Sequence, residues 1–203
     1  MPQTTLTADT SAARERLLDA AQTLMLAQGF AATTVDAICN AANVTKGCFF
    51  HYFDSKDELG TIVLKRFCES GRAVHQGLCG RETDPLKRVY AYIDGTIKLS
   101  QDPVLGKGCL LGLFSQELAD TNPAMRKACC EGFEEWAQGF TKELSAAKAR
   151  YAPTKSFSPK EVAEHFIAVL EGSMILSKTR RDMRVMAQNL KHFKAYVQSL
   201  YEA

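Results

Sequence analysis

The chain of 203 residues lacks both a long apolar run and a strong excess of charge. No hydrophobic stretch approaches the ~20 residues that span a bilayer. The first residues also lack the basic, apolar and small-residue order of a secretion signal. We therefore expect a cytoplasmic protein with no membrane partner. The net charge is only +2, which argues against strong non-specific binding to nucleic acids.

Signatures of enzymes and metal proteins are missing as well. None of the seven cysteines is spaced C-x-x-C, which argues against zinc ribbons and thioredoxin-like proteins. There is no G-x-G-x-x-G motif and no P-loop. The histidines, at positions 51, 75, 165 and 192, show no motif with a cysteine that would indicate a nucleophile and its base. The sequence thus predicts no enzyme, no catalytic residue, no metal site and no cofactor, and most cysteines are expected to be small buried hydrophobes.

The residues that are present favour an ordinary globular protein built from helices. Hydrophobic residues make up 46% and charged residues 24% of the chain, which is enough apolar material for a sizeable core. Apolar residues recur at helical spacing, and no segment alternates with the period of a strand. We therefore predict an all-α fold. Beyond residue 55 the expected helices cover about 56–79, 86–99, 110–118, 123–151, 159–178 and 182–201.

Between Thr33 and Glu58 the sequence predicts two short helices, a tight turn between them and the start of a third helix. Thr33 and Asp36 form a T-x-x-D capping box that starts the first helix at about residue 34. Asn43 favours the left-handed conformation in which many helices end. Ser55 and Glu58 form a second capping box. This layout is typical of a helix-turn-helix, in which the second helix enters the DNA major groove.

The second short helix begins with residues suited to a DNA surface. Thr45 is expected to cap it, and Lys46, Gly47 and Cys48 occupy its first turn, where recognition helices meet base edges. Glycine is about 1 kcal/mol worse than alanine within a helix. A close approach of the backbone to DNA would explain Gly47.

The rest of this helix divides into inward and outward residues. Phe49 and Phe53 are four positions apart and are expected to hold the helix against its scaffold. His51 and Tyr52 are expected to face outward and reach phosphate. Lys56, in the first turn of the next helix, is a further phosphate-binding candidate.

Charge alone does not indicate DNA binding in this region. Residues 1–55 contain three basic side chains against five acidic ones. A plain helical hairpin in an all-α protein is therefore the alternative interpretation of the spacing.

The segment Arg14–Leu59 resembles the N-terminal domain of the TetR family of transcriptional repressors. The resemblance is carried by L-L-D-A-A at 17–21, Q-G-F-A-A-T-T-V at 28–35, V-T-K-G at 44–47 and F-H-Y-F-D-S-K-D-E-L at 50–59. It implies a TetR-like fold of about nine helices. A three-helix DNA-binding head would cover residues 1–55, with 1–10 as a flexible arm, and an effector-binding and dimerisation body would cover 56–203.

The resemblance also implies partners and contacts. A homodimer, formed through the last two helices, would place its heads on a pseudo-palindromic operator in double-stranded DNA. The alternative for those helices is that they only complete the core of one chain. Phe50 departs from the family, since many relatives have Tyr there and a phenylalanine cannot donate a hydrogen bond to phosphate. The residues implied to contact DNA are Thr34, Thr45, Lys46, Gly47, Cys48, His51, Tyr52 and Lys56.

Cys109 is a candidate sensor residue. It follows Gly108 at the start of an expected helix, and Lys107 lies two positions before it. A helix N-terminus and a nearby cation both lower the pKa of a thiol, and small flanking residues would leave the sulfur accessible. Simple packing of Cys109 at a helix start is the alternative.

The string G-C-L-L-G-L-F-S-Q-E-L at 108–118 resembles the NemR-like branch of the family, whose repressors respond to electrophiles or unsaturated acids. The resemblance implies that Cys109 is modified by an electrophile or oxidant, with the amine of Lys178 close to the thiol. Trp136 and Phe133 are candidates for lining an effector pocket, or else belong to the core. A purely non-covalent hydrophobic or acidic ligand is the alternative, and a thiol-dependent enzyme is a remote one.

Overall fold

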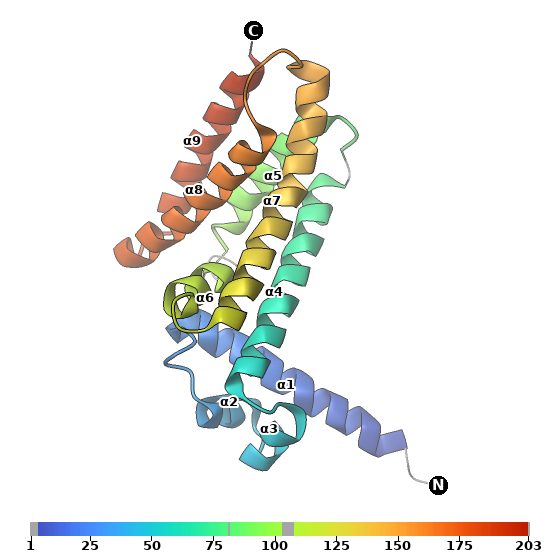
Figure 1. Ribbon diagram of the computed structural model, residues 1–203, viewed down its shortest axis with the longest axis vertical. Helices are drawn as coiled ribbons and strands as arrows, with labels where there is room; N and C mark the ends of the chain where they lie inside the picture. Colours follow the sequence, from blue (N-terminus) through green and yellow to red (C-terminus); the bar gives the residue numbers. More distant parts are fainter. Residues whose placement is uncertain (1–3, 81, 103–107, 203) are drawn as a thin grey trace. The chain divides into compact units, whose positions relative to one another are not determined.

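Helices form every regular element in the part of the chain that the structure describes. The structure is a computed structural model that describes residues 4–80, 82–102 and 108–202, and over these ranges it contains nine α-helices and no strand (Figure 1). The prediction of an all-α fold with about nine helices is confirmed. The helices are α1 (Thr4–Gln28), α2 (Val35–Ala42), α3 (Lys46–Tyr52), α4 (Lys56–Cys79), α5 (Pro85–Leu99), α6 (Leu110–Leu118), α7 (Pro123–Tyr151), α8 (Pro159–Arg180) and α9 (Arg184–Tyr201).

Capping residues and prolines set several of these boundaries. Asp84 caps α5 by accepting hydrogen bonds from the amides of Leu86 (3.1 Å) and Lys87 (3.0 Å), and a proline occupies the first turn of that helix. Ser158 caps α8 in the same manner, again with a proline in the first turn. Proline suits this position because its missing N–H would have no partner there. The predicted bounds of α4 and α7 are confirmed.

Helix α1 starts earlier than the sequence indicates. It begins at Thr4, so residues 4–10 are helical, whereas they were expected to form part of a flexible arm. The flexibility of this arm stays a prediction, and residues 1–3 lie outside the described part of the chain. Once a helix has nucleated, each added residue gains a backbone hydrogen bond, which allows an alanine-containing segment to extend it.

Packing divides the chain into two compact units. The first comprises the described residues up to 67 together with 109–130, and the second comprises the described residues of 68–108 and 131–203. Helices α4 and α7 contribute to both units. The division predicted at residue 55 concerns the DNA-binding function of the head, and it stays a prediction.

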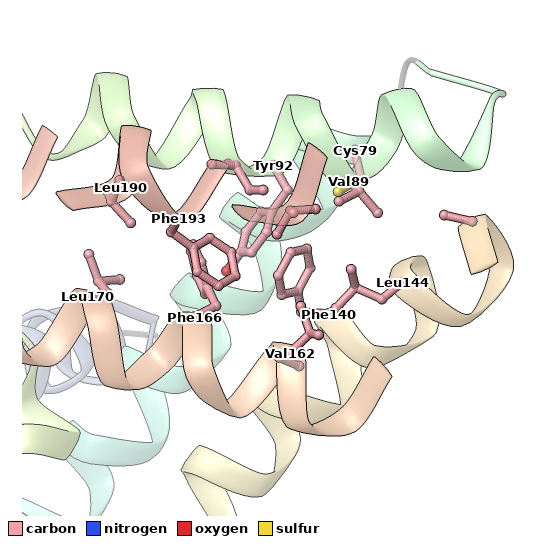
Figure 2. Close-up of a cluster of buried hydrophobic side chains, with 14 of the residues drawn as sticks. Cys79, Val89, Tyr92, Phe140, Leu144, Val162, Phe166, Leu170, Leu190 and Phe193 are labelled. Atoms are coloured by element: carbon pink, nitrogen blue, oxygen red, sulfur yellow. The ribbon is translucent and has the colours of Figure 1, made fainter. Parts of the chain in front are cut away.

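The core of the second unit is built around aromatic rings from α5, α7, α8 and α9 (Figure 2). Tyr92 lies 4.9 Å from Phe140 and 5.3 Å from Phe166, measured between ring centroids. Phe166 in turn packs against Phe193 at 5.3 Å. Burial raises the pKa of Tyr92, whose hydroxyl oxygen accepts a hydrogen bond from the indole N–H of Trp136 (2.7 Å). Offset and edge-on ring pairs of this kind stabilise a core beyond their buried area.

Helices α8 and α9 form an antiparallel hairpin in the second unit (Figure 1). Arg181 ends α8 in the left-handed conformation, and the amide of Asp182 donates to the carbonyl of Ser177 (3.0 Å). The hydroxyl of Ser177 donates back to the carbonyl of Asp182 (2.7 Å). This closed turn fixes where α9 begins. No helix in the described ranges is both long enough and apolar enough to cross a membrane.

Candidate DNA-binding surface and sensor helix

Helix α2 is capped one residue later than the sequence predicts. The Oγ1 of Thr34, not of Thr33, accepts the hydrogen bond from the amide of Ala37 (3.1 Å). Thr33 is fully buried, and its hydroxyl donates to the carbonyl of Gly29 (2.7 Å). The predicted capping box was therefore misplaced, because the first threonine is used to close the turn before α2.

The turn between α2 and α3 has the left-handed residue that the sequence predicts. Asn43 has φ 52° and ψ 53°, and its amide donates to the carbonyl of Asn40 (3.2 Å). The amide of Val44 donates to the carbonyl of Cys39 (3.0 Å), so the exposed end of α2 is closed by two hydrogen bonds. Asparagine tolerates this conformation better than most side chains, which makes the turn compact.

Helix α3 presents its N-terminal end to solvent. Thr45 caps it by accepting from the amide of Cys48 (3.2 Å). Thr45, Lys46 and Gly47 are exposed, and Cys48 is half-buried. The ammonium of Lys46 pairs with the carboxylate of Asp36 on α2 at 3.0 Å, and both side chains are exposed. The predicted base-facing residues thus lie together on one accessible surface.

Two phenylalanines hold α3 in place from beneath. Phe49 and Phe53 are buried, with ring centroids 5.6 Å apart, and the guanidinium of Arg14 on α1 lies 5.6 Å from the Phe53 ring. The inward direction predicted for both rings is confirmed. Phe50 is 51% exposed, so a large apolar ring lies on the solvent side of α3. His51 is exposed as well.

Gly47 is not required by the fold of the free chain. A Cβ atom built there would have the Oγ1 of Thr45 at 3.8 Å and no closer neighbour among the described atoms. Its backbone is helical, without a positive φ. Neither crowding nor backbone strain within the chain therefore accounts for glycine at this position.

Lys56 has an internal function that the sequence did not indicate. Its ammonium donates to the carbonyls of Phe30 and Thr33, both at 2.9 Å, and lies 4.4 Å from the centre of the Phe30 ring. These contacts fasten the start of α4 to the loop before α2. The predicted phosphate contact of Lys56 stays a prediction, since an ammonium group has a third N–H.

Glu117 on α6 also holds this loop in place, and the sequence did not indicate this function. Its carboxylate accepts hydrogen bonds from the backbone amides of Phe30 (3.1 Å) and Ala31 (2.8 Å), in the same loop. Phe114, one turn earlier, meets the Phe30 ring edge-on at 5.3 Å. Gly29 has φ +86°, and a side chain there would collide with the Glu117 carboxylate. Helix α6 therefore stabilises the loop before α2, which leads into the helix-turn-helix.

Cys109 lies at the start of α6, as predicted, but it is not accessible. It is the N-cap residue of the helix, its carbonyl accepts from the amide of Leu113 (3.0 Å), and its exposed fraction is 5%. The expectation of an accessible sulfur was wrong, because the helix that follows buries Leu110, Leu111 and Phe114. Lys107, the cation expected nearby, lies outside the described residues.

The other predicted effector residues belong to the second unit. Lys178 is exposed in the last turn of α8, and Cys109 is in the first unit. The predicted approach of the Lys178 amine to the Cys109 thiol therefore stays a prediction. Trp136 stacks on Phe133 with a centroid distance of 6.4 Å, and both are half-buried. Trp136 packs against the aromatic core, so its lining of an effector pocket also stays a prediction.

Comparison with known proteins identifies the class of protein. Residues 17–60 match the family described as bacterial regulatory proteins, tetR family, and residues 85–193 match the one described as tetracyclin repressor-like, C-terminal domain. The second match alone covers more than half of the chain. The chain therefore belongs to the TetR family of helix-turn-helix transcription regulators.

Particular relatives match almost the whole chain. DhaR, an HTH-type transcriptional repressor of Mycobacterium sp. (strain GP1), is 28% identical over 178 residues, which cover 87% of this chain and 88% of DhaR. NemR, an HTH-type transcriptional repressor of Escherichia coli (strain K12), is 28% identical over 185 residues, covering 89% and 92%. The crystal structure of reduced E. coli NemR superimposes with a TM-score of 0.78 at 27% identity, covering 90% of this chain and 95% of that one.

Proposed function

We propose that this chain is a homodimeric repressor of transcription that acts in the cytoplasm on a pseudo-palindromic DNA operator. The observation that carries the proposal is the exposed leading end of α3, seated on the buried rings of Phe49 and Phe53. Recognition helices meet base edges with such an end. The relatives DhaR and NemR are both named as repressors, which supports repression here.

Within the head, proposed to span residues 1–55, α3 reads bases and the flanking residues bind the backbone. Thr45, Lys46, Gly47 and Cys48 provide the accessible first turn. Phosphate contacts fix the register of a protein on DNA but carry no direct sequence information, so the two groups are expected to differ in specificity. The residues proposed to contact DNA are Thr34, Thr45, Lys46, Gly47, Cys48, His51, Tyr52 and Lys56.

Nuclease footprinting on the DNA upstream of the chain's own gene tests this proposal. We expect protection of two half-sites about one helical turn of DNA apart, since a two-fold dimer places its heads on successive major grooves. Lys46→Ala should weaken binding, and Lys160→Ala, an exposed lysine on α8, is the matched control. Absence of specific protection at every salt concentration would overturn the proposal.

We propose that α8 and α9 form the dimer interface. The hairpin carries three large exposed hydrophobic side chains, Ile175, Leu176 and Tyr196. Pairing two such hairpins around a two-fold axis would bury them in a four-helix bundle. Ile175→Glu should give a monomer by light scattering, whereas Val74→Glu, at an exposed valine on α4, should stay dimeric. The same behaviour of both variants would contradict this interface.

Release from DNA is proposed to follow the binding of a small effector to the body, residues 56–203, or the modification of Cys109. Cys109 is buried in the folded chain, so the start of α6 would have to open before its sulfur bonds to an electrophilic carbon, and the thiol proton would then pass to the adduct. Cys109 occupies the N-cap position of α6, and Glu117 of the same helix accepts from the amides of Phe30 and Ala31. Displacement of α6 would therefore disturb the loop before α2. A difference in affinity of a few kcal/mol between two states is enough for release.

N-ethylmaleimide serves as the probe for this step. The probe is applied to chains that carry Cys48→Ser, because Cys48 is one of the residues proposed to contact DNA. In that background we expect release from the operator when Cys109 is present, no release when Cys109→Ser is added, and unchanged release when Cys130→Ser, at an exposed cysteine, is added. Release of Cys109→Ser by the probe would remove Cys109 from the mechanism. Release of that variant by an unreactive hydrophobic or acidic ligand would favour a non-covalent effector instead, with Trp136, Phe133 and Lys178 as the candidate contacts.

A further inference from the structure

Three side chains that commonly bind metals converge in the second unit. His75 and Cys79 on α4 and Glu143 on α7 each offer a ligand atom, and these atoms all lie within 4.8 Å of one another. Among the described residues this is the group of histidine, cysteine and acidic side chains that meets that spacing. Its members are distinct from Cys109 and from the DNA-facing residues of α3.

The convergence follows from the local structure. His75 and Cys79 are four residues apart on one helix, which places both on the same face. Across from them, Gly139 on α7 lies close to the imidazole: a Cβ atom at that position would lie 3.6 Å from the ring, an ordinary van der Waals contact. The imidazole also stacks on Tyr92, with centroids 4.3 Å apart and planes inclined by 28°. The orientation of the ring is thus fixed before any ligand binds.

The Glu143 carboxylate is held in place by Arg88. The Nε and Nη2 atoms of the guanidinium donate to the two carboxylate oxygens, at 2.6 Å and 2.7 Å. Each carboxylate oxygen can accept more than one interaction, so Glu143 can bind a metal ion while it is held by Arg88. Partners that orient a ligand in this manner are a regular feature of metal sites.

Cys79 is 1% exposed, and its sulfur lies 3.9 Å from the carbonyl oxygen of Arg88, to which the thiol donates. Burial lowers the pKa of His75 and raises the pKa of Cys79 to about 11, so the proposal depends on the placement of the three side chains and not on their titration. The cluster thus combines one imidazole nitrogen, one thiol sulfur and one carboxylate oxygen.

We propose that His75, Cys79 and Glu143 form a binding site for one zinc-class ion, with water as the fourth ligand. Nitrogen and sulfur donors favour Zn²⁺ over Mg²⁺ or Ca²⁺, which prefer oxygen. Ligand atoms around tetrahedral Zn²⁺ lie roughly 3.4–3.8 Å apart, so the side chains need to close by about 1 Å. The thiol releases its proton to solvent on binding, and the resulting thiolate offsets part of the positive charge of the ion. The ion would tie the end of α4 to α7.

Isothermal titration of the full-length, metal-free protein with Zn²⁺, with a phosphine reductant in place of dithiols, tests the site. We expect one ion per chain, and affinity at least ~10-fold weaker in His75→Ala, Cys79→Ser and Glu143→Gln. His165→Ala and Cys130→Ser, at exposed positions, are the matched controls and should bind like wild type. Titration with Mg²⁺ should give no binding.

Co²⁺ gives a second readout that does not depend on affinity. A thiolate bound to Co²⁺ produces a charge-transfer absorption band in the near ultraviolet, and this band should be lost in Cys79→Ser but kept in Cys130→Ser. Glu143→Gln retains a side chain that can accept from Arg88, so it guards against loss of binding through misfolding. The proposal is overturned if wild-type protein binds no Zn²⁺, or if binding is unchanged in all three ligand variants. Neither result touches the proposed DNA binding, because the measurement contains no DNA.

Discussion

The helix-turn-helix and the aromatic core of the second unit are held together in different ways. Helices α2 and α3 have eight and seven residues, too few to be stable alone in water. Single hydroxyl groups on Thr34 and Thr45 and one left-handed asparagine fix their ends. The second unit instead has helices of 15 to 29 residues that meet through packed rings. Individual polar contacts therefore shape the DNA-facing surface, whereas buried volume shapes the body.

The largest expected effect tests whether packed aromatic rings hold the second unit together. Phe166→Ala removes a ring that contacts Tyr92, Phe140 and Phe193, and such truncations cost about 3–5 kcal/mol. Urea denaturation at a fixed protein concentration measures the loss in free energy of unfolding. Val74→Ala, at an exposed valine outside the proposed dimer interface, should stay within ~0.5 kcal/mol of wild type. Equal stability of the two variants would show that the rings do not hold the body together.

Glu117 tests whether polar contacts hold the first unit. Glu117→Ala leaves the amides of Phe30 and Ala31 without their charged acceptor, and we expect a cost of about 1–2 kcal/mol. Hydrogen exchange of both amides should speed up. Glu117→Gln keeps one acceptor oxygen and should lie between Ala and wild type. Unchanged exchange in Glu117→Ala would mean that the loop is held by Lys56 and apolar packing alone.

Two substitutions of Thr45 separate the effect of its capping hydroxyl from that of the rest of the side chain. Thr45→Ala should cost about 1 kcal/mol, since the amide of Cys48 loses its acceptor. Thr45→Ser retains the hydroxyl and should be close to wild type. Denaturation and hydrogen exchange of Cys48 measure the cap, and footprinting measures its effect on DNA affinity. A serine variant as unstable as the alanine variant would contradict the assigned cap.

The smallest expected change in stability comes from Gly47 and has the opposite sign. Because a Cβ atom would make only an ordinary contact with the Oγ1 of Thr45, Gly47→Ala should stabilise the free protein by up to about 1 kcal/mol. Operator affinity should nevertheless fall, since the added methyl group would stand between the backbone and DNA. Affinity equal to wild type would show that this backbone does not approach the duplex closely.

Local chemistry explains which parts of the fold were predictable. The starts of α4 and α7 follow from Ser55, Asn122 and Pro123, and the amides of Glu58 and Met125 indeed donate to Ser55 and Asn122. Each of these signals involves residues at most four positions apart. The prediction that Thr33 caps α2 was wrong for a related reason. Two adjacent threonines can both cap the start of this helix, and only burial decides between them.

Contacts between distant residues explain what could not be predicted. Glu117 and Phe30 are 87 positions apart, and nothing in either local sequence indicates that they meet. The burial of Cys109 and the internal bonds of Lys56 likewise depend on neighbours supplied by other helices. For the candidate DNA-binding surface, the helical spacing of the sequence predicts which positions lie on α3 and which of them are exposed. The contacts between α6 and the loop before α2 do not follow from the sequence and are seen only in the folded structure.

The exposed pair of Lys46 and Asp36 has a consequence for how this protein responds to ionic strength. In the free chain the lysine is already paired with a carboxylate, so a contact of Lys46 with DNA replaces an existing ion pair. The number of counterions displaced from DNA is correspondingly small in a head with so few cations. Occupancy of an operator should then vary only gently as the salt content of the cell changes.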